Sequence, residues 1–171
     1  MADGSQRREK IMEILKERVN PVSGGEFAAM FGVSRQVIVQ DIALLRAVNK
    51  DILATSKGYV IYHQNKGRCH RCVFVRHSAK EIRDELITII ENGGKVLDVV
   101  VDHDVYGQIS ADLILESVQD VDTFCYRLEH SQSKPLNVIA DGDHMHTVEA
   151  ASEVILDNIE RALREEGYLR E

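Results

Sequence analysis

The sequence is poor in the features that mark exported, membrane-spanning and disulfide-rich proteins. Its 171 residues include two prolines, three cysteines and no tryptophan. No stretch approaches the ~20 consecutive apolar residues of a membrane-spanning helix. The polar start, MADGSQRREK, lacks the apolar core of an export signal, so we expect a cytoplasmic protein with no membrane partner. A content of 44% hydrophobic and 29% charged residues is typical of a globular chain of one ordinary or two small domains.

The few cysteines predict reduced thiols. Cys69 and Cys72 form the stretch CHRC, and Cys125 stands alone; cytoplasmic thiols stay reduced. A CxxC pair can hold zinc when two further ligands are near, and His63 and His70 are the candidates. Such a site normally has a second pair at similar spacing, so zinc here is the less favoured interpretation.

The charge is unevenly distributed along the chain. The net charge of −7 taken alone argues against nucleic acid, but residues 1–62 carry 9 Lys and Arg against 7 Asp and Glu. The rest of the chain carries 12 against 21. This asymmetry predicts two domains with different partners, residues 1–62 and 71–171, joined by a polar linker over residues 63–70.

The first domain has the pattern of three helices. Apolar residues recur at helical spacing over residues 7–18, and a proline follows. Ser23, with Glu26 three residues later, forms a capping box that opens a second helix. Gly32 closes that helix, and Ser34 can cap a third.

The third helix and the segment after it have residues suited to reading DNA. An apolar stripe of Ile38, Ile42 and Leu45 can face the domain core, while Arg and Gln side chains face outward. Arginine pairs with guanine and glutamine with adenine, each bidentate contact giving roughly 1–3 kcal/mol of discrimination. Residues 52–55 and 59–62 predict a hairpin whose basic turn would lie against phosphates. The candidate DNA contacts are Ser34, Arg35, Gln36, Gln40 and Lys57.

Together these elements predict a helix-turn-helix with a β-hairpin wing. The alternative is a three-helix packing module whose polar side chains merely face water. The stretch GVSRQVIVQDIALLRA and the SKGY turn resemble the winged helix shared by the biotin-ligase repressor and several other bacterial repressors, over roughly residues 5–62. The resemblance implies binding to operator DNA. Because one slightly positive domain makes few phosphate contacts, we expect a homodimer on two half-sites.

The second domain has the predicted element order β-α-β-β-α-β-α. The first six elements suit a ferredoxin-like split β-α-β sheet, followed by an extra C-terminal helix. The predicted fold class is therefore α+β, an N-terminal winged helix-turn-helix followed by a ferredoxin-like domain. The predicted strands cover residues 71–77, 95–103, 108–115 and 144–150, and the helices cover residues 78–92, 117–130 and 152–167.

Four side chains converge on one corner of this predicted sheet. Antiparallel pairing of its first and fourth strands brings His77 beside His144 and His146, and strand alternation puts all three on one face. Glu85 falls within the buried stripe of the following helix, where a carboxylate is costly unless its charge is cancelled. We predict that His77, Glu85, His144 and His146 hold one divalent ion per subunit, from Zn, Ni, Mn or Fe.

Two ordinary interpretations compete with a metal site. A His-x-His pair on a strand is often exposed or simply hydrogen-bonded, and Glu85 could instead form a salt bridge with Arg76 or Arg83 at the rim. The convergence of four independent placements favours the metal.

Three motifs carry a wider resemblance: VRHSAKEIRDEL, DVVVDHDVYGQISADL and DHMHTVEA. From Arg71 onward the chain resembles the three-histidine (3H) domain. With the winged helix in front, it resembles the nicotinate-responsive bacterial repressors of genes for NAD-precursor uptake and synthesis. The family's central motif usually reads His-Pro-Val-Tyr-Gly, where this chain has residues 103–107, HDVYG. The usual glycine-rich turn before the final histidines is Asp-Gly-Asp at residues 141–143.

The resemblance implies a repressor, not an enzyme, with nicotinic acid as co-repressor. A carboxylate effector needs a cation, so nicotinate would bind the metal or His103, with its ring against Tyr106. In one alternative, the divalent ion itself is the effector of a metal-sensing repressor. In another, the chain is a small metal-dependent hydrolase, for which Asp102, Asp104 and Asp143 are only nearby candidates as general base.

Overall fold

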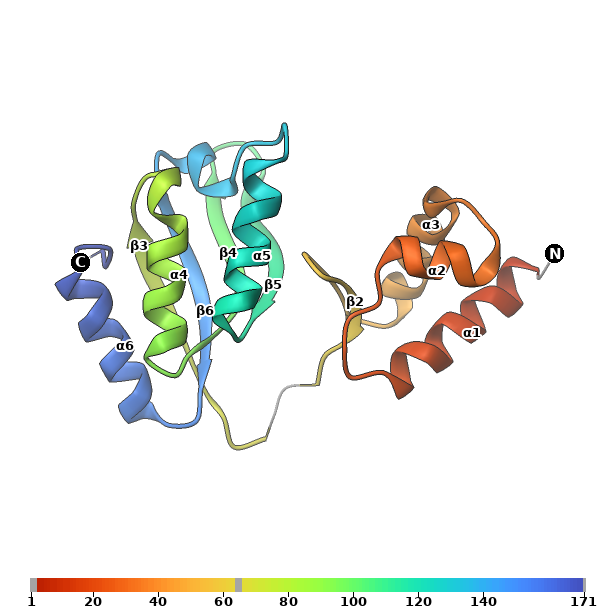
Figure 1. Ribbon diagram of the computed structural model, residues 1–171, viewed down its shortest axis with the longest axis horizontal. Coiled ribbons are helices and arrows are strands. Elements are labelled where there is room, and N and C mark those ends of the chain that lie inside the picture. The colour runs from red at the N-terminus through yellow and green to blue at the C-terminus, as the bar shows by residue number, and fades with distance from the viewer. Residues whose placement is uncertain (1–2, 64–65, 171) are drawn as a thin grey trace. The chain divides into compact units, whose positions relative to one another are not determined.

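The computed structural model describes residues 3–63 and 66–170 (Figure 1). The chain divides after residue 64 into two compact units, each with its own hydrophobic core. The linker predicted over residues 63–70 includes residues 64 and 65, which lie outside the described residues.

The first unit is the predicted winged helix-turn-helix. Its helices are α1 (Gly4–Glu17), α2 (Gly24–Phe31) and α3 (Arg35–Val48). The antiparallel hairpin of β1 (Ile52–Thr55) and β2 (Gly58–Ile61) follows them. Helices α2 and α3 are bent by 108° at the short break between them, within the range of helix-turn-helix motifs.

The turn between these helices forms because of its caps. The Ser23 side chain accepts a hydrogen bond from the Glu26 amide, and the Ser34 side chain accepts one from the Val37 amide. Gly32 ends α2 in the left-handed conformation, with φ 63°. The buried face of α3, with Ile38 and Ile42, then packs in the core beside Phe27 of α2.

Two further contacts fix the wing and the first helix. Val22 and Tyr59 exchange two backbone hydrogen bonds, which tie the α1–α2 loop to β2. A Cβ at Gly58 would lie 2.5 Å from the Val22 carbonyl oxygen, so this close approach requires glycine. Arg7 and Arg8 of α1 both donate to the buried carboxylate of Asp41 on α3.

The second unit has the predicted element order. Its strands are β3 (Cys69–Arg76), β4 (Lys95–His103), β5 (Gly107–Leu115) and β6 (Asp143–Ala150). Its helices are α4 (Ile82–Glu91), α5 (Val118–Glu129) and α6 (Glu153–Glu165). Short 3₁₀ turns, η1 (Ala79–Glu81) and η2 (Leu136–Ala140), precede α4 and β6.

The sheet of this unit keeps the predicted pairing of its first and last strands. The order is β5-β4-β6-β3, with every neighbouring pair antiparallel. Each β-α-β unit is split by one inserted strand, because β6 lies between β3 and β4, and β4 lies between β6 and β5. The interior strands are thus the second and fourth of the unit, whereas the ferredoxin arrangement has the first and third inside.

The three helices of this unit cover one face of the sheet (Figure 1). Apolar side chains from alternate positions, such as Val73, Val75 and Val148, meet Leu86 and Ile159 of the helices in the hydrophobic core. His77, His144 and His146 lie on this same covered face, at one end of the sheet. Beyond α6, Leu169 pairs with Val75 at the outer edge of β3.

No single helix among the described residues is long and apolar enough to cross a membrane. The bent pair of α2 and α3 passes the same test by length and composition only.

Candidate metal centre and DNA-reading face

The register of β3 and β6 brings three histidines together. Val75 pairs with His144 and Val73 with His146, so His77, one position beyond β3, lies beside the start of β6. The ring centroids of His77 and His144 are 4.7 Å apart, and those of His144 and His146 are 4.9 Å apart. All three side chains are buried.

Each of these imidazoles is oriented by a backbone carbonyl. The Nδ1–H of His77 donates to the Ser78 carbonyl at 2.8 Å, and that of His144 donates to Gly142 at 2.8 Å. The Nδ1–H of His146 donates to Asp98 at 2.6 Å. These bonds place a proton on Nδ1, so Nε2 carries the lone pair of each ring in its neutral form. Metal-binding histidines are typically held in this way by a second partner.

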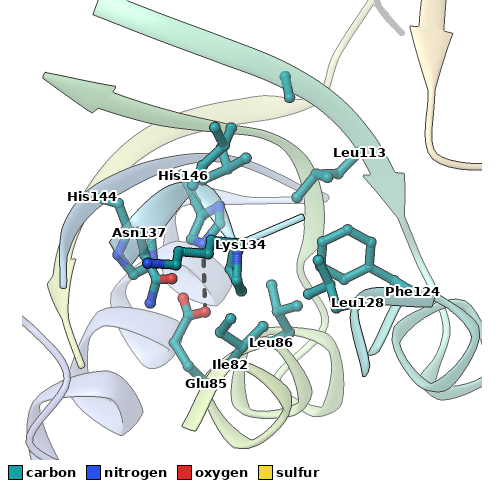
Figure 2. A pocket seen from close by; sticks show the side chains of 14 residues that line it. Ile82, Glu85, Leu86, Leu113, Phe124, Leu128, Lys134, Asn137, His144 and His146 are labelled. Atoms are coloured by element: carbon teal, nitrogen blue, oxygen red, sulfur yellow. Dashed lines mark ion pairs between the residues drawn. The ribbon is translucent and has the colours of Figure 1, made fainter. Parts of the chain in front are cut away.

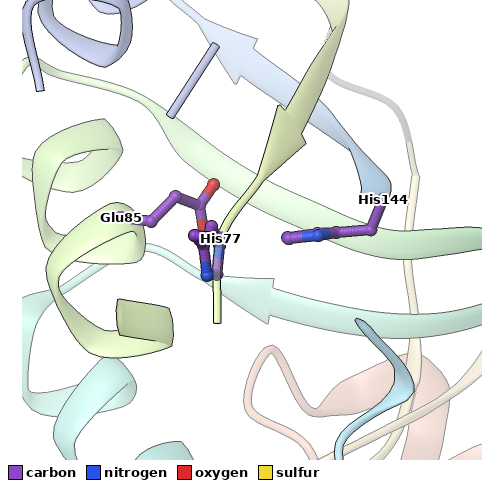
Figure 3. A group of neighbouring side chains, drawn as sticks. All are labelled: His77, Glu85 and His144. Atoms are coloured by element: carbon purple, nitrogen blue, oxygen red, sulfur yellow. The ribbon is translucent and has the colours of Figure 1, made fainter. Parts of the chain in front are cut away.

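Glu85 of α4 faces the histidines from the helical layer. Its Oε2 lies 3.5 Å from Nε2 of His77 and 3.4 Å from Nε2 of His146. Ligand atoms of His77, Glu85 and His144 all lie within 4.8 Å of one another (Figure 3). The competing pairing with Arg83 is absent among the described residues, because Arg83 binds Asp122 at 2.8 Å.

Three buried polar atoms of this cluster lack hydrogen-bond partners among the described residues. Within the described ranges, neither carboxylate oxygen of Glu85 nor Nε2 of His77 has one, although all are buried. Buried polar atoms are almost always paired in folded proteins. Unpaired nitrogen and oxygen atoms that point at one another therefore fit a cation between them.

The Glu85 carboxylate and the three imidazoles shift one another's pKa values. Burial alone would raise the pKa of Glu85, but the charge of His146 and the close imidazoles outweigh it and lower that pKa to about 2. Burial and the neighbouring His146 lower the pKa of His144 to about 4, so this ring is neutral at pH 7. Burial also opposes the charged forms of His77 and His146, but the Glu85 carboxylate outweighs it and raises both pKa values.

The turn before β6 is part of the site, and the sequence did not reveal its role. The Asn137 side-chain amide donates to the His77 backbone carbonyl at 3.3 Å, while the Asn137 backbone carbonyl accepts from the Gly142 amide at 2.8 Å. Gly142 has φ 92°, and a Cβ there would lie 2.6 Å from the His77 carbonyl oxygen. Asn137 and Gly142 thus fix the backbone around two of the histidines.

An apolar cavity of about 190 Å³ opens beside the cluster (Figure 2). Leu86, Leu113 and Phe124 supply much of its apolar wall, and Glu85, His144 and His146 lie at one side. Lys134 and Asn137, from the segment that joins α5 to β6, add an ammonium and an amide. Oδ1 of Asn137 is buried and has no hydrogen-bond partner in the described part of the chain.

The effector residues predicted from sequence lie elsewhere. His103 and Tyr106 contact each other at the β4–β5 turn, with ring centroids 4.9 Å apart. Nδ1 of His103 accepts hydrogen bonds from the amides of Val105 and Tyr106, and the Tyr106 side chain is largely exposed. Neither residue lines the cavity beside the histidines.

The candidate DNA contacts are distributed over α3 and the wing. Arg35, Gln36 and Gln40 are exposed on one side of α3. The Ser34 hydroxyl caps this helix, and Lys57 lies half-buried in the turn between β1 and β2. Arg46, on the exposed side of the predicted helix, has its guanidinium bound to the Ile52 carbonyl at 3.1 Å, which ties α3 to β1.

The CHRC pair does not form a metal site with its neighbours among the described residues. Cys69 and Cys72 lie three positions apart on β3 and therefore point to opposite faces of the sheet. His70 instead contacts the buried carboxylate of Glu149 at 3.1 Å.

Comparison with known proteins matches both units to domain families. Residues 7–60 match a helix-turn-helix (HTH) domain, and residues 70–171 match the 3H domain. The "Probable transcription repressor NiaR" of Thermotoga maritima is 40% identical over 166 residues, covering 97% of this chain and 94% of that protein. The "Transcription repressor NadR" of Bacillus subtilis is 37% identical over 169 residues, covering 97% of this chain and 94% of that protein.

Proposed function

Because the chain belongs to the family of transcription repressors that join an HTH domain to a 3H domain, we propose that it is a DNA-binding repressor of niacin-uptake and NAD-biosynthesis genes. In this proposal nicotinic acid is the co-repressor, and it binds in the second unit beside a divalent metal ion. The observation that carries the sensing half is the group of three imidazoles whose Nε2 atoms face a buried carboxylate.

The donor set fits one transition-metal ion per subunit. His77, His144 and His146 would each offer Nε2, and Glu85 would offer a carboxylate oxygen. Imidazole and carboxylate together suit Zn, Ni, Mn or Fe. When bound, such an ion would supply a positive charge in an otherwise apolar region. It would also satisfy the polar atoms that lack partners within the described chain.

The cavity suits a small aromatic acid. Its volume of about 190 Å³ equals roughly six waters at ~30 Å³ each, which is the scale of one substituted ring. Leu113 and Phe124 would pack against the ring faces. The Lys134 ammonium would bind the carboxylate as a charge-assisted pair, while the amide of Asn137 would fix the orientation. We favour this cavity as the nicotinate site over the β4–β5 turn, because His103 and Tyr106 do not line the cavity. Nicotinate binding at His103 and Tyr106 stays a separate prediction.

Control of transcription requires that nicotinate prefer one geometry of a homodimer. Two copies of α3 would then match two half-sites of the operator. An effector that bound both geometries equally would change nothing, so its binding must favour the operator-bound geometry.

The proposal is tested by operator binding in the presence of three small ligands. The probe is a fluorescent duplex selected by the full-length chain from a random DNA pool, titrated with nicotinate, nicotinamide or benzoate. Nicotinate should tighten DNA binding strongly, nicotinamide little because it lacks the carboxylate charge, and benzoate less because it lacks the ring nitrogen. DNA affinity that is the same with and without nicotinate would contradict the co-repressor proposal while leaving the DNA-binding unit untouched.

A metal-sensing repressor is the second candidate. Four protein donors can close a tetrahedral coordination sphere, as in structural zinc sites, whereas a catalytic ion keeps an open position. The same duplex, titrated with the ion after chelation and without nicotinate, separates the two repressors. A metal sensor responds to the ion alone, whereas a nicotinate sensor needs both.

A further inference from the structure

The first two turns of α3 expose one apolar side chain among polar ones. Arg35, Gln36 and Gln40 are exposed there, and Val39 lies beside them on the same side of the helix. The opposite side, with Ile38 and Ile42, is buried in the core of the first unit. The first turns of α3 therefore present a guanidinium, two amides and one isopropyl group together.

Val39 is not part of the hydrophobic core of the first unit. Val39 is 36% exposed, and it is not among the side chains packed against the core of that unit. A glutamine or serine there would leave the described core contacts unchanged.

An apolar group in the major groove has one specific counterpart. The C5 methyl of thymine projects into that groove, and small apolar side chains recognise it by contact. Glutamine amides recognise adenine N6 and N7 in the same groove. Val39 stands three positions after Gln36 and directly before Gln40, so the three side chains can reach neighbouring base pairs.

We propose that Val39 is a specificity-determining residue that reads the methyl group of a thymine in each half-site. This inference rests on DNA binding by the first unit, as proposed above, and adds the identity of one recognised base. The adjacent glutamines then read adenines beside that thymine, which makes this part of the half-site rich in A·T pairs.

Other exposed apolar residues of α3 do not share this position. Leu44 is 57% exposed and Val48 is 84% exposed, but they lie on the third and fourth turns. Recognition helices contact base edges mainly through their N-terminal residues. Leu44 is therefore the matched control, an exposed apolar residue on the same helix that should not read a base.

The experiment removes the methyl group from the DNA without changing its base pairing. Each thymine of a duplex selected by the full-length chain is replaced in turn by deoxyuridine. Binding of the wild type, Val39→Ala and Leu44→Ala is then measured by fluorescence anisotropy. Loss of one buried methyl should weaken wild-type binding about fourfold per half-site, at one thymine position. Val39→Ala should bind thymine and deoxyuridine equally there, whereas Leu44→Ala should retain the wild-type difference.

Two results would overturn the inference. One is wild-type binding that is insensitive to deoxyuridine at every position, and the other is the same deoxyuridine effect in wild type and Val39→Ala. Both leave DNA binding itself intact, whereas failure to select any duplex would refute the DNA-binding proposal as well. Circular dichroism of both variants checks that the fold is unchanged, and sedimentation velocity reports whether Val39 contacts another copy instead.

Discussion

The buried carboxylates of Asp41 in the first unit and Glu85 in the second have different partners. In the first unit the one buried charged side chain among the described residues, Asp41, is matched by two arginines that donate to its carboxylate. In the second unit Glu85 is equally buried, but it faces the imidazoles of His77 and His146, which carry a charge only when protonated. The arginines of the first unit tie α1 to α3, whereas the carboxylate and imidazoles of the second unit form a group that could hold a metal ion.

The largest expected effect is loss of metal binding in Glu85→Gln. Replacing the only carboxylate of the cluster removes its negative charge, so affinity for Ni²⁺ or Zn²⁺ should fall by at least about 100-fold. Isothermal titration calorimetry of the metal-free protein measures this affinity. Elemental analysis of the wild type should find one ion per subunit. Asp41→Ala is the matched control in the other unit and should keep wild-type metal affinity. Equal metal affinity in Glu85→Gln and wild type would place the ion elsewhere.

The variant Asp41→Ala should lower the stability of the first unit without changing metal binding by the second. Asp41→Ala leaves Arg7 and Arg8 without their shared carboxylate, so α1 should detach more readily from α3. We expect the first unit to lose about 2 kcal/mol of stability, the scale of a hydrogen bond to a charged group. Hydrogen exchange of the α3 amides measures this loss. Unchanged protection of those amides would show that the two arginines contribute little.

A smaller effect is expected from Lys134→Met. The variant keeps an apolar stem of similar length but loses the ammonium, so nicotinate should bind about tenfold more weakly. Metal affinity should stay at the wild-type value because Lys134 is not a donor in the cluster. His103→Ala provides the comparison at the β4–β5 turn. If it weakens nicotinate binding and Lys134→Met does not, the effector lies at that turn.

The smallest effect concerns the cap of the reading helix. Ser34→Ala removes the side chain that accepts from the Val37 amide, which should cost about 1 kcal/mol of stability. Thermal unfolding followed by circular dichroism measures this cost. A loss in operator affinity larger than this stability change would show that the Ser34 hydroxyl also contacts DNA.

Local patterns in the sequence were sufficient for much of the fold. Serine caps, Gly32 and the apolar stripes gave the helices of the first unit, because each depends on neighbours within a few positions. Strand alternation also placed His77, His144 and His146 on one face, and the helical stripe around Leu86 placed Glu85 toward them. The pairing of β3 with β6 brings the three histidines together, and α4 adds Glu85.

The rest depends on contacts between distant segments, which no local pattern encodes. The order of the strands, with β3 at one edge, joins segments that lie far apart in the sequence. Asn137 looks like an ordinary loop residue in the sequence, and its importance comes from the close approach of its loop to His77. In the sequence, Lys134 is notable only as the residue before Pro135. Its place at the cavity depends on how its loop folds.

The pairing of Leu169 with Val75 places the end of the described chain against β3 and His77. The Arg76 backbone amide donates to the Tyr168 carbonyl, and the Arg170 backbone amide donates to the Phe74 carbonyl. The ring centroids of Tyr168 and His77 are 5.5 Å apart. Proteolytic removal of residues 168–170 would therefore expose the His77 imidazole to solvent. It would also leave backbone groups of β3 free to pair with other molecules. An affinity tag fused directly after this segment would place foreign residues within reach of the same imidazole.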